Sequence, residues 1–144
     1  MRRFVTNDGG RSAAGFKGRA NDCVVRAISI AAQLPYAQVY SDLAAWSGGE
    51  TWRDRRVKQS HPRTGIHRKT YQRYLEYLGF VWTPTMKIGQ GCKVHLKREE
   101  LPSGRLVVAL SRHLTAVIDG TIHDTGNPDR GGRRCVYGYY RKPV

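Results

Sequence analysis

The segment HLTAVIDGTIHDT, residues 113–125, limits the possible folds more than any other part of this 144-residue chain. Its centre, Asp119-Gly120, is typical of the two-residue type I′ turn that joins antiparallel strands. With these two residues in the turn, Ile118 is expected to pair with Thr121, and both strands continue in the same register. The second half of the chain therefore predicts an antiparallel sheet.

Helices are expected in the first half. Residues 23–33 are almost entirely apolar, which is typical of a helix buried on most sides, and Asp22 precedes them as a candidate N-cap. A second helix is expected from Pro35 to Gly48-Gly49. A third helix is expected within residues 65–80, and further strands at 80–84, 91–96, 105–110 and 134–140. Helices followed by strands predict an α+β fold, with N-terminal helices packed on a C-terminal antiparallel sheet.

The length of the chain favours one domain, residues 21–144, preceded by a basic irregular arm at residues 1–20. No apolar run approaches the roughly 20 residues that a membrane span requires. The two arginines near the N-terminus are not followed by an apolar segment, so no secretory signal is expected. These features favour an intracellular location or a virion, and they predict no membrane partner.

The formal net charge of +14 favours acidic partners, and nucleic acid above all. The basic residues gather in segments 1–19, 53–73 and 130–142. Contact with nucleic acid or an acidic protein is one interpretation of these segments, and a solvated, soluble surface is the other. No motif for reading individual bases accompanies them.

Three cysteines, Cys23, Cys92 and Cys135, form an odd set without a secretory signal, which argues against a disulfide framework. Cys92 and His95 have the spacing of a zinc half-site, but no second half-site of matching spacing follows. The sequence therefore predicts neither a metal nor another cofactor.

The predicted hairpin places His113 and Asp124 on one face of the sheet, because side chains alternate along a strand. A carboxylate there can bond one imidazole nitrogen and leave the other to act as a base. Asn127 is an alternative partner for the ring, and His123 is expected on the opposite face with a structural or exposed role.

Cys23 is expected at a helix N-terminus, where an imidazolium lowers the pKa of a thiol from ~8.5 to roughly 3.5–7.5. The backbone N–H groups of the first turn, and the Asn21 side chain, are candidate donors to an oxyanion. Arg26 is spaced to pair with Asp22 one turn earlier. A cysteine that merely packs in the core remains the alternative.

These pieces resemble a known family. A cysteine that opens a buried N-terminal helix, followed late in the chain by a histidine and an aspartate on adjacent strands, is similar to the papain-like cysteine peptidases. The compact domains that process bacteriocin leader peptides are the nearer comparison. The pieces NDCVVRAISIA, SRHLTAVIDGTIHDT and CVYGYY are also similar to small proteins of tailed bacteriophages, across about residues 18–140.

The resemblance implies Cys23 as nucleophile, His113 as general base and Asp124 as the residue that orients the base. The family often has glutamine six positions before the nucleophile as an oxyanion donor, and Lys17 stands there in this chain. Lys17 and Asn21 are thus the candidate side chains for the oxyanion site.

Two functions follow as expectations. The first is a cysteine hydrolase acting on a protein or peptide through a thioester acyl-enzyme; acyl transfer and deamidation share its first step. The second is a catalytically silent, basic, papain-like component of a phage particle, which binds nucleic acid or other virion proteins. Either one is expected in the host cytoplasm or the virion.

Overall fold

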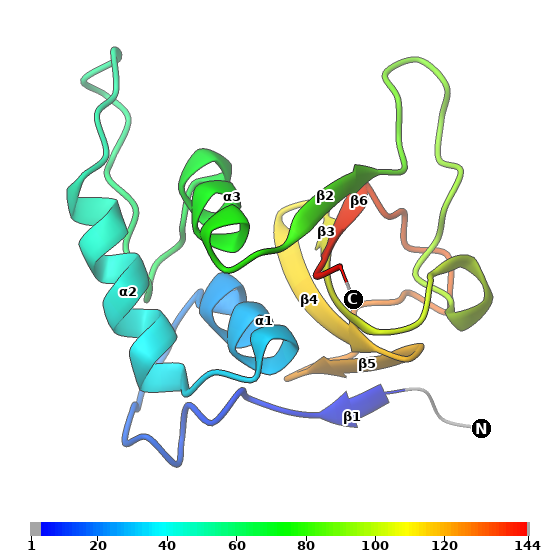
Figure 1. Ribbon diagram of the computed structural model, residues 1–144, viewed down its shortest axis with the longest axis horizontal. Coiled ribbons are helices and arrows are strands. Elements are labelled where there is room, and N and C mark those ends of the chain that lie inside the picture. Colours follow the sequence, from blue (N-terminus) through cyan, green and yellow to red (C-terminus); the bar gives the residue numbers. More distant parts are fainter. Residues whose placement is uncertain (1–3, 144) are drawn as a thin grey trace.

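The computed structural model describes residues 4–143 and has an α+β fold. Three α-helices, α1 (Cys23–Ala32), α2 (Tyr36–Gly48) and α3 (Arg68–Tyr77), precede most of the sheet (Figure 1). The strands are β1 (Phe4–Thr6), β2 (Val81–Pro84), β3 (Arg105–Leu110), β4 (His113–Ile118), β5 (Thr121–Asp124) and β6 (Gly138–Arg141), and a 3-10 turn covers Arg98–Glu100. Their order in the sheet is β1-β5-β4-β3-β6-β2.

The predicted hairpin is confirmed at its predicted register. Ile118 pairs with Thr121 and Val117 with Ile122, so β4 and β5 are joined by the turn at Asp119-Gly120. β3 pairs with the other edge of β4, which puts β4 inside the sheet. Every neighbouring pair is antiparallel except β1 and β5, which are parallel.

The expectation of an irregular arm over residues 1–20 is wrong for Phe4–Thr6, which form β1. Phe4 pairs with Ile122 and Thr6 with Asp124, so the partner strand supplies the order of this short segment. A strand of three residues has too little alternation to be recognised by itself. Residues 1–3 lie outside the described part of the chain.

The expectation of a strand at 91–96 is also wrong. This segment is irregular and makes one isolated bridge, between His95 and Cys135. The last strand begins at Gly138, because only from there does the chain pair with both β2 and β3.

A disulfide joins Cys92 to Cys135, which corrects the expectation drawn from the odd cysteine count. The two residues are 43 positions apart, and their Cα atoms lie 5.8 Å apart, within the range that a disulfide spans. Cys92 is therefore not available to the zinc half-site that its spacing suggested. Cys23 is the free thiol.

The sheet separates two apolar clusters, and one of them fixes the position of α1. On the helical side, Val25 and Ile28 of α1 are fully buried against Val107 and Leu114 of the sheet. α2 packs on α1, and α3 on α2 (Figure 1). The other side of the sheet carries a smaller cluster around Leu106 and Val117. Within residues 4–143, no helix combines the length and apolar character needed to cross a membrane.

Gly138 gives a test of the packing between β6 and β2. A Cβ added there would lie 2.3 Å from the Trp82 ring and 2.7 Å from the Thr83 carbonyl oxygen. We expect Gly138→Ala to lower the free energy of unfolding by about 1–3 kcal/mol, measured by urea denaturation, because the core would be overpacked. The matched variant Gly48→Ala, which meets no atom within 4 Å, should unfold no more easily than the parent. Equal stability of the two variants would contradict the packing.

Candidate active site

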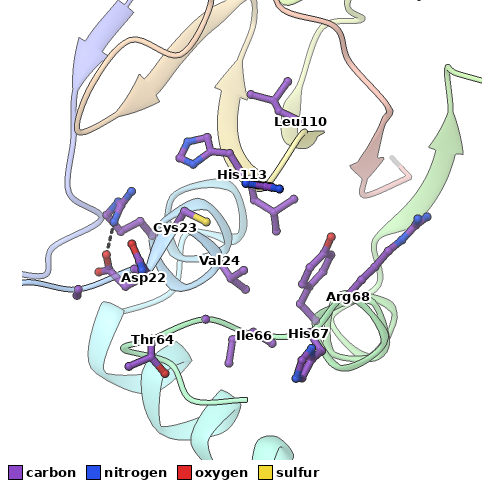
Figure 2. Close-up of a pocket in the computed structure, with 16 residues that line it drawn as sticks. Asp22, Cys23, Val24, Thr64, Ile66, His67, Arg68, Leu110 and His113 are labelled. Carbon is purple, nitrogen blue, oxygen red and sulfur yellow. Dashed lines mark hydrogen bonds and ion pairs between the residues drawn. The ribbon is translucent and has the colours of Figure 1, made fainter. Parts of the chain in front are cut away.

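Cys23 is the first residue of α1, and the packing of this helix on β4 brings its thiol to His113 (Figure 2). The His113 side chain and the thiol form a hydrogen bond, and the backbone N–H of Leu114 also donates to the sulfur. The first residue of β4, an inner strand of the sheet, thus meets the first residue of the buried helix α1. The predicted encounter of Cys23 with His113 is present.

Asp124 holds the far side of the imidazole. Nε2 of His113 lies 2.7 Å from Oδ2 of Asp124, and the Thr115 hydroxyl donates to the same oxygen at 2.7 Å. Because Asp124 accepts from Nε2, the nitrogen left for Cys23 is Nδ1. The three side chains form a continuous chain of hydrogen bonds from thiol to carboxylate, on the face that the hairpin register predicted.

The Asp124 carboxylate is only 4% exposed. Burial by itself raises the pKa of Asp124, but the hydrogen bonds from His113 and Thr115 outweigh it and the pKa falls below its ordinary value. The backbone N–H of Thr125 donates to the other oxygen at 2.7 Å. Asp124 is therefore ionised at neutral pH and stabilises a positive charge on His113.

The electrostatics of the other two residues favour an ion pair. Burial lowers the pKa of His113, yet its hydrogen bonds to Asp124 and Cys23 raise it on balance to about 9. Burial raises the pKa of the Cys23 thiol, but the hydrogen bonds with His113 and Leu114 lower it on balance. The positive charges of His113 and Arg26 act in the same direction. Both shifts favour the thiolate and imidazolium pair, which is the reactive form of a cysteine nucleophile.

Arg26 connects this chain to a second buried carboxylate. Its guanidinium pairs with Asp22 one turn earlier, as predicted, and Nη2 also lies 3.4 Å from Oδ1 of Asp124. Asp22 makes no side-chain cap, contrary to the expectation; it accepts from the Tyr36 hydroxyl at 2.6 Å and lies 3.4 Å from Arg11. The helix spacing reveals the first pair only, because Asp124 is 98 residues from Arg26.

A cavity of about 670 Å³ opens over the thiol, a size typical of ligand sites. One wall comes from residues 20–24 with Arg26, and another comes from residues 64–68 (Figure 2). Tyr71 of α3 also lines the cavity. The third side is closed by His113 and Leu114 of β4, with Leu110 at the end of β3 and Arg112 in the turn between the two strands. Cys23 is thus reachable from the cavity while Asp124 is covered.

Of the two expected oxyanion side chains, only Asn21 lines this cavity. Lys17 is exposed on the preceding loop, where its carbonyl oxygen accepts from Arg11 and Arg63. The expectation for Lys17 is therefore wrong, because the loop turns between the two positions. The backbone N–H groups that open α1 remain donors without a carbonyl one turn earlier in the helix.

The remaining candidates lie elsewhere. Asn127, the alternative partner for the ring, is exposed and accepts from the backbone of Asp129 at 3.1 Å. His123 is half-buried, and its Nδ1 lies 3.3 Å from the Asn7 amide. Within residues 4–143 no group of three or more His, Cys, Asp or Glu side chains is arranged to hold a metal ion.

Comparison with protein-family models, curated proteins and solved structures found no match to this chain.

The pKa directions predict unusual reactivity at low pH. The alkylation rate of an ordinary thiol, with a pKa of about 8.5, falls roughly 80-fold from pH 8 to pH 6. We expect alkylation of Cys23 by iodoacetamide, followed by intact mass, to fall less than about tenfold over this range, because the pKa of the thiol is lowered.

His113→Ala should restore the steep fall, because it removes the imidazolium from the thiol. His123→Ala, on the other face of the same hairpin, should leave the profile unchanged. A parent thiol that reacts only above pH 8 would contradict the ion pair.

The two ion pairs of Arg26 predict that its replacement lowers the free energy of unfolding. Arg26→Met leaves the carboxylates of Asp22 and Asp124 buried beside an apolar side chain, so we expect a loss of about 3–5 kcal/mol in urea denaturation at pH 7. Arg56→Met breaks an exposed pair with Asp54 and should change little. The loss from Arg26→Met should shrink as the pH falls and Asp124 takes up a proton, because the pKa of Asp124 is lowered in the parent protein. A loss that does not depend on pH would count against the charge explanation.

Proposed function

We propose that this protein is a cysteine hydrolase that cleaves peptide bonds. The observation that carries the proposal is the unbroken chain of hydrogen bonds from Cys23 through His113 to the buried Asp124. Acyl transfer through a thiol requires an activated sulfur and a group that transfers a proton to the leaving amine. A cysteine bonded to a histidine, which an aspartate orients, meets both requirements. The resemblance to papain-like peptidases, including those that process bacteriocin leaders, supports a peptide substrate.

The reaction follows from the arrangement of these groups. The Cys23 thiolate attacks the carbonyl carbon, and a tetrahedral intermediate forms whose oxyanion faces the N-terminal N–H groups of α1 and the Asn21 amide. The His113 imidazolium gives its Nδ1 proton to the leaving amine as the C–N bond breaks, and a thioester remains. Neutral His113 then takes a proton from water, hydroxide displaces the sulfur, and the imidazolium and thiolate are restored.

Asp124 has a positioning role in this scheme. Its bond to Nε2 fixes the ring so that Nδ1 faces the sulfur, and its charge stabilises the imidazolium. Thr115 and Arg26 occupy further lone pairs of the carboxylate, so the aspartate itself cannot rotate away. Acyl transfer to an amine and deamidation would use the same first step.

The proposal predicts cleavage that depends on each member of the chain. A random-sequence decapeptide mixture incubated with the protein should yield new termini, read by mass spectrometry, and Cys23→Ala should abolish them. His113→Gln and Asp124→Asn should each reduce the initial rate by roughly 10²–10⁴-fold. The control His123→Gln should retain the parent rate. Products that persist in Cys23→Ala would overturn the proposal.

A basic, catalytically silent component of a phage particle is the second candidate. The loop between α2 and α3 favours it, because Arg53, Arg55 and Lys58 are all exposed there. This candidate predicts affinity for nucleic acid that falls steeply with salt and does not change in Cys23→Ala. Under either candidate, we propose the host cytoplasm or the virion as the location.

A further inference from the structure

We propose that the cleft at Cys23 takes an acidic peptide, whose aspartate and glutamate side chains are bound by Arg68, Arg112 and Arg130 on the two sides of the nucleophile. This inference rests on the proposed hydrolase function and adds the class of substrate to it. Three observations carry it: a second cavity beside the first, an unbalanced positive charge around both, and an apolar wall near the thiol.

The second cavity lies on the other side of His113. It also has a volume of about 670 Å³, and it shares Arg112 and His113 with the cavity over Cys23. Most of its other residues come from the segment that follows β5, and they include Arg130 and Arg134. A chain that lies across His113 would therefore occupy both cavities, with its scissile carbonyl at Cys23 in the first cavity.

The charge around these cavities is positive and unopposed. Only Asp22 and Asp124 contribute carboxylates to the two linings, and they are 2% and 4% exposed. Both are already bonded to Arg26. Their negative charge is therefore neutralised inside the protein by Arg26. The outer arginines determine the electrostatic field that a substrate meets.

The arginines differ in how free they are. Arg112 is exposed, and it makes no side-chain hydrogen bond or ion pair with the residues that the structure describes. Arg134 is held by the Ser111 carbonyl oxygen at 2.8 Å. Arg130 and Arg134 both line the second cavity, and burial and then the charge of Arg130 lower the pKa of Arg134. A bound carboxylate would relieve this repulsion.

Arg68 lies at the opposite end, on α3. Its guanidinium stacks over the Trp82 ring at 5.1 Å, which orients it while leaving it exposed. Arg68 and Arg112 thus stand on different walls of the first cavity, and Arg130 extends the positive surface into the second. Such a separation suits several carboxylates along an extended peptide better than one compact anion.

Nucleic acid would also satisfy the charge, but the site itself favours a peptide. A thiolate attacks a carbonyl carbon, which a phosphodiester lacks. The wall near Cys23 is apolar, with Val24 and Ile66 buried and Tyr71 beside them, and so can receive a side chain next to the scissile bond.

The test uses two isosteric peptide chloromethyl ketones, Ac-Glu-Asp-Ala-Gly and Ac-Gln-Asn-Ala-Gly, which alkylate Cys23 irreversibly. Rates are measured by intact mass at pH 6.5 and low salt. We expect the acidic reagent to react at least about tenfold faster, since a focused positive field raises the local concentration of an anion. The ratio should fall in 0.5 M NaCl because salt screens exposed charges.

Two double variants that lose the same amount of charge, one at the cavities and one away from them, test which residues cause the preference. Arg112→Gln/Arg130→Gln should bring the ratio of the two rates close to one. Arg53→Gln/Lys69→Gln removes the same charge from exposed residues that line neither cavity, and should keep the parent ratio. Thermal unfolding of each variant checks that it is folded.

Alkylation by iodoacetamide at pH 6 distinguishes a failure of the proposed substrate class from a failure of the hydrolase proposal. If it alkylates Cys23 rapidly while the acidic and amide peptides react equally, the substrate class is wrong and the hydrolase proposal stands. If neither iodoacetamide at pH 6 nor the peptide reagents at pH 6.5 alkylate Cys23, the hydrolase proposal fails and this inference fails with it. If an oligo-dT 20-mer protects Cys23 at lower concentration than a 20-residue glutamate peptide, the positive surface is a nucleic-acid site and the inference is overturned.

Discussion

The buried carboxylate of Asp124 is the constraint on which the arrangement of this protein depends. An ionised group removed from water costs several kcal/mol unless its oxygens are fully bonded. Here the donors come from three places: Arg26 of α1, His113 and Thr115 of β4, and the backbone of Thr125. Satisfying one carboxylate therefore fixes how the first helix sits on the hairpin. The parallel pairing of β1 beside Asp124 covers the strand from its other edge.

The charges of the interior are balanced in the reactive form of the site. Asp22, Asp124 and the Cys23 thiolate supply three negative charges, and Arg11, Arg26 and the His113 imidazolium supply three positive ones. Removing a proton from the imidazolium, or adding one to the thiolate, would leave a charge without its opposite. This explains why the pKa of Cys23 falls and that of His113 rises although burial acts against both. The high net charge of the chain thus belongs to the outer arginines and lysines.

What could be predicted from the sequence was local. Asp119-Gly120 fixed a register, and alternation then placed His113 and Asp124 on one face; the spacing of Asp22 and Arg26 gave one ion pair. The partners that were missed are distant in the chain and leave no periodic trace: β1 on β5, Cys92 with Cys135, and Arg26 with Asp124. That Cys23 meets His113 followed from a resemblance, because no local pattern relates two residues that only tertiary packing brings together.

The two candidate oxyanion side chains, Lys17 and Asn21, show why linear spacing misleads at this site. Counting six residues back from Cys23 leads to Lys17, but the intervening loop is folded against Arg63, which donates to the carbonyl oxygens of Lys17 and Arg19. The backbone N–H of Asn21 in turn donates to the Arg63 carbonyl oxygen at 2.7 Å. These bonds hold Lys17 outward and set Asn21 at the rim of the cavity. A loop anchored in this way can supply a side-chain amide from two residues before the nucleophile, so the absence of glutamine at the earlier position does not by itself remove an oxyanion donor from the site.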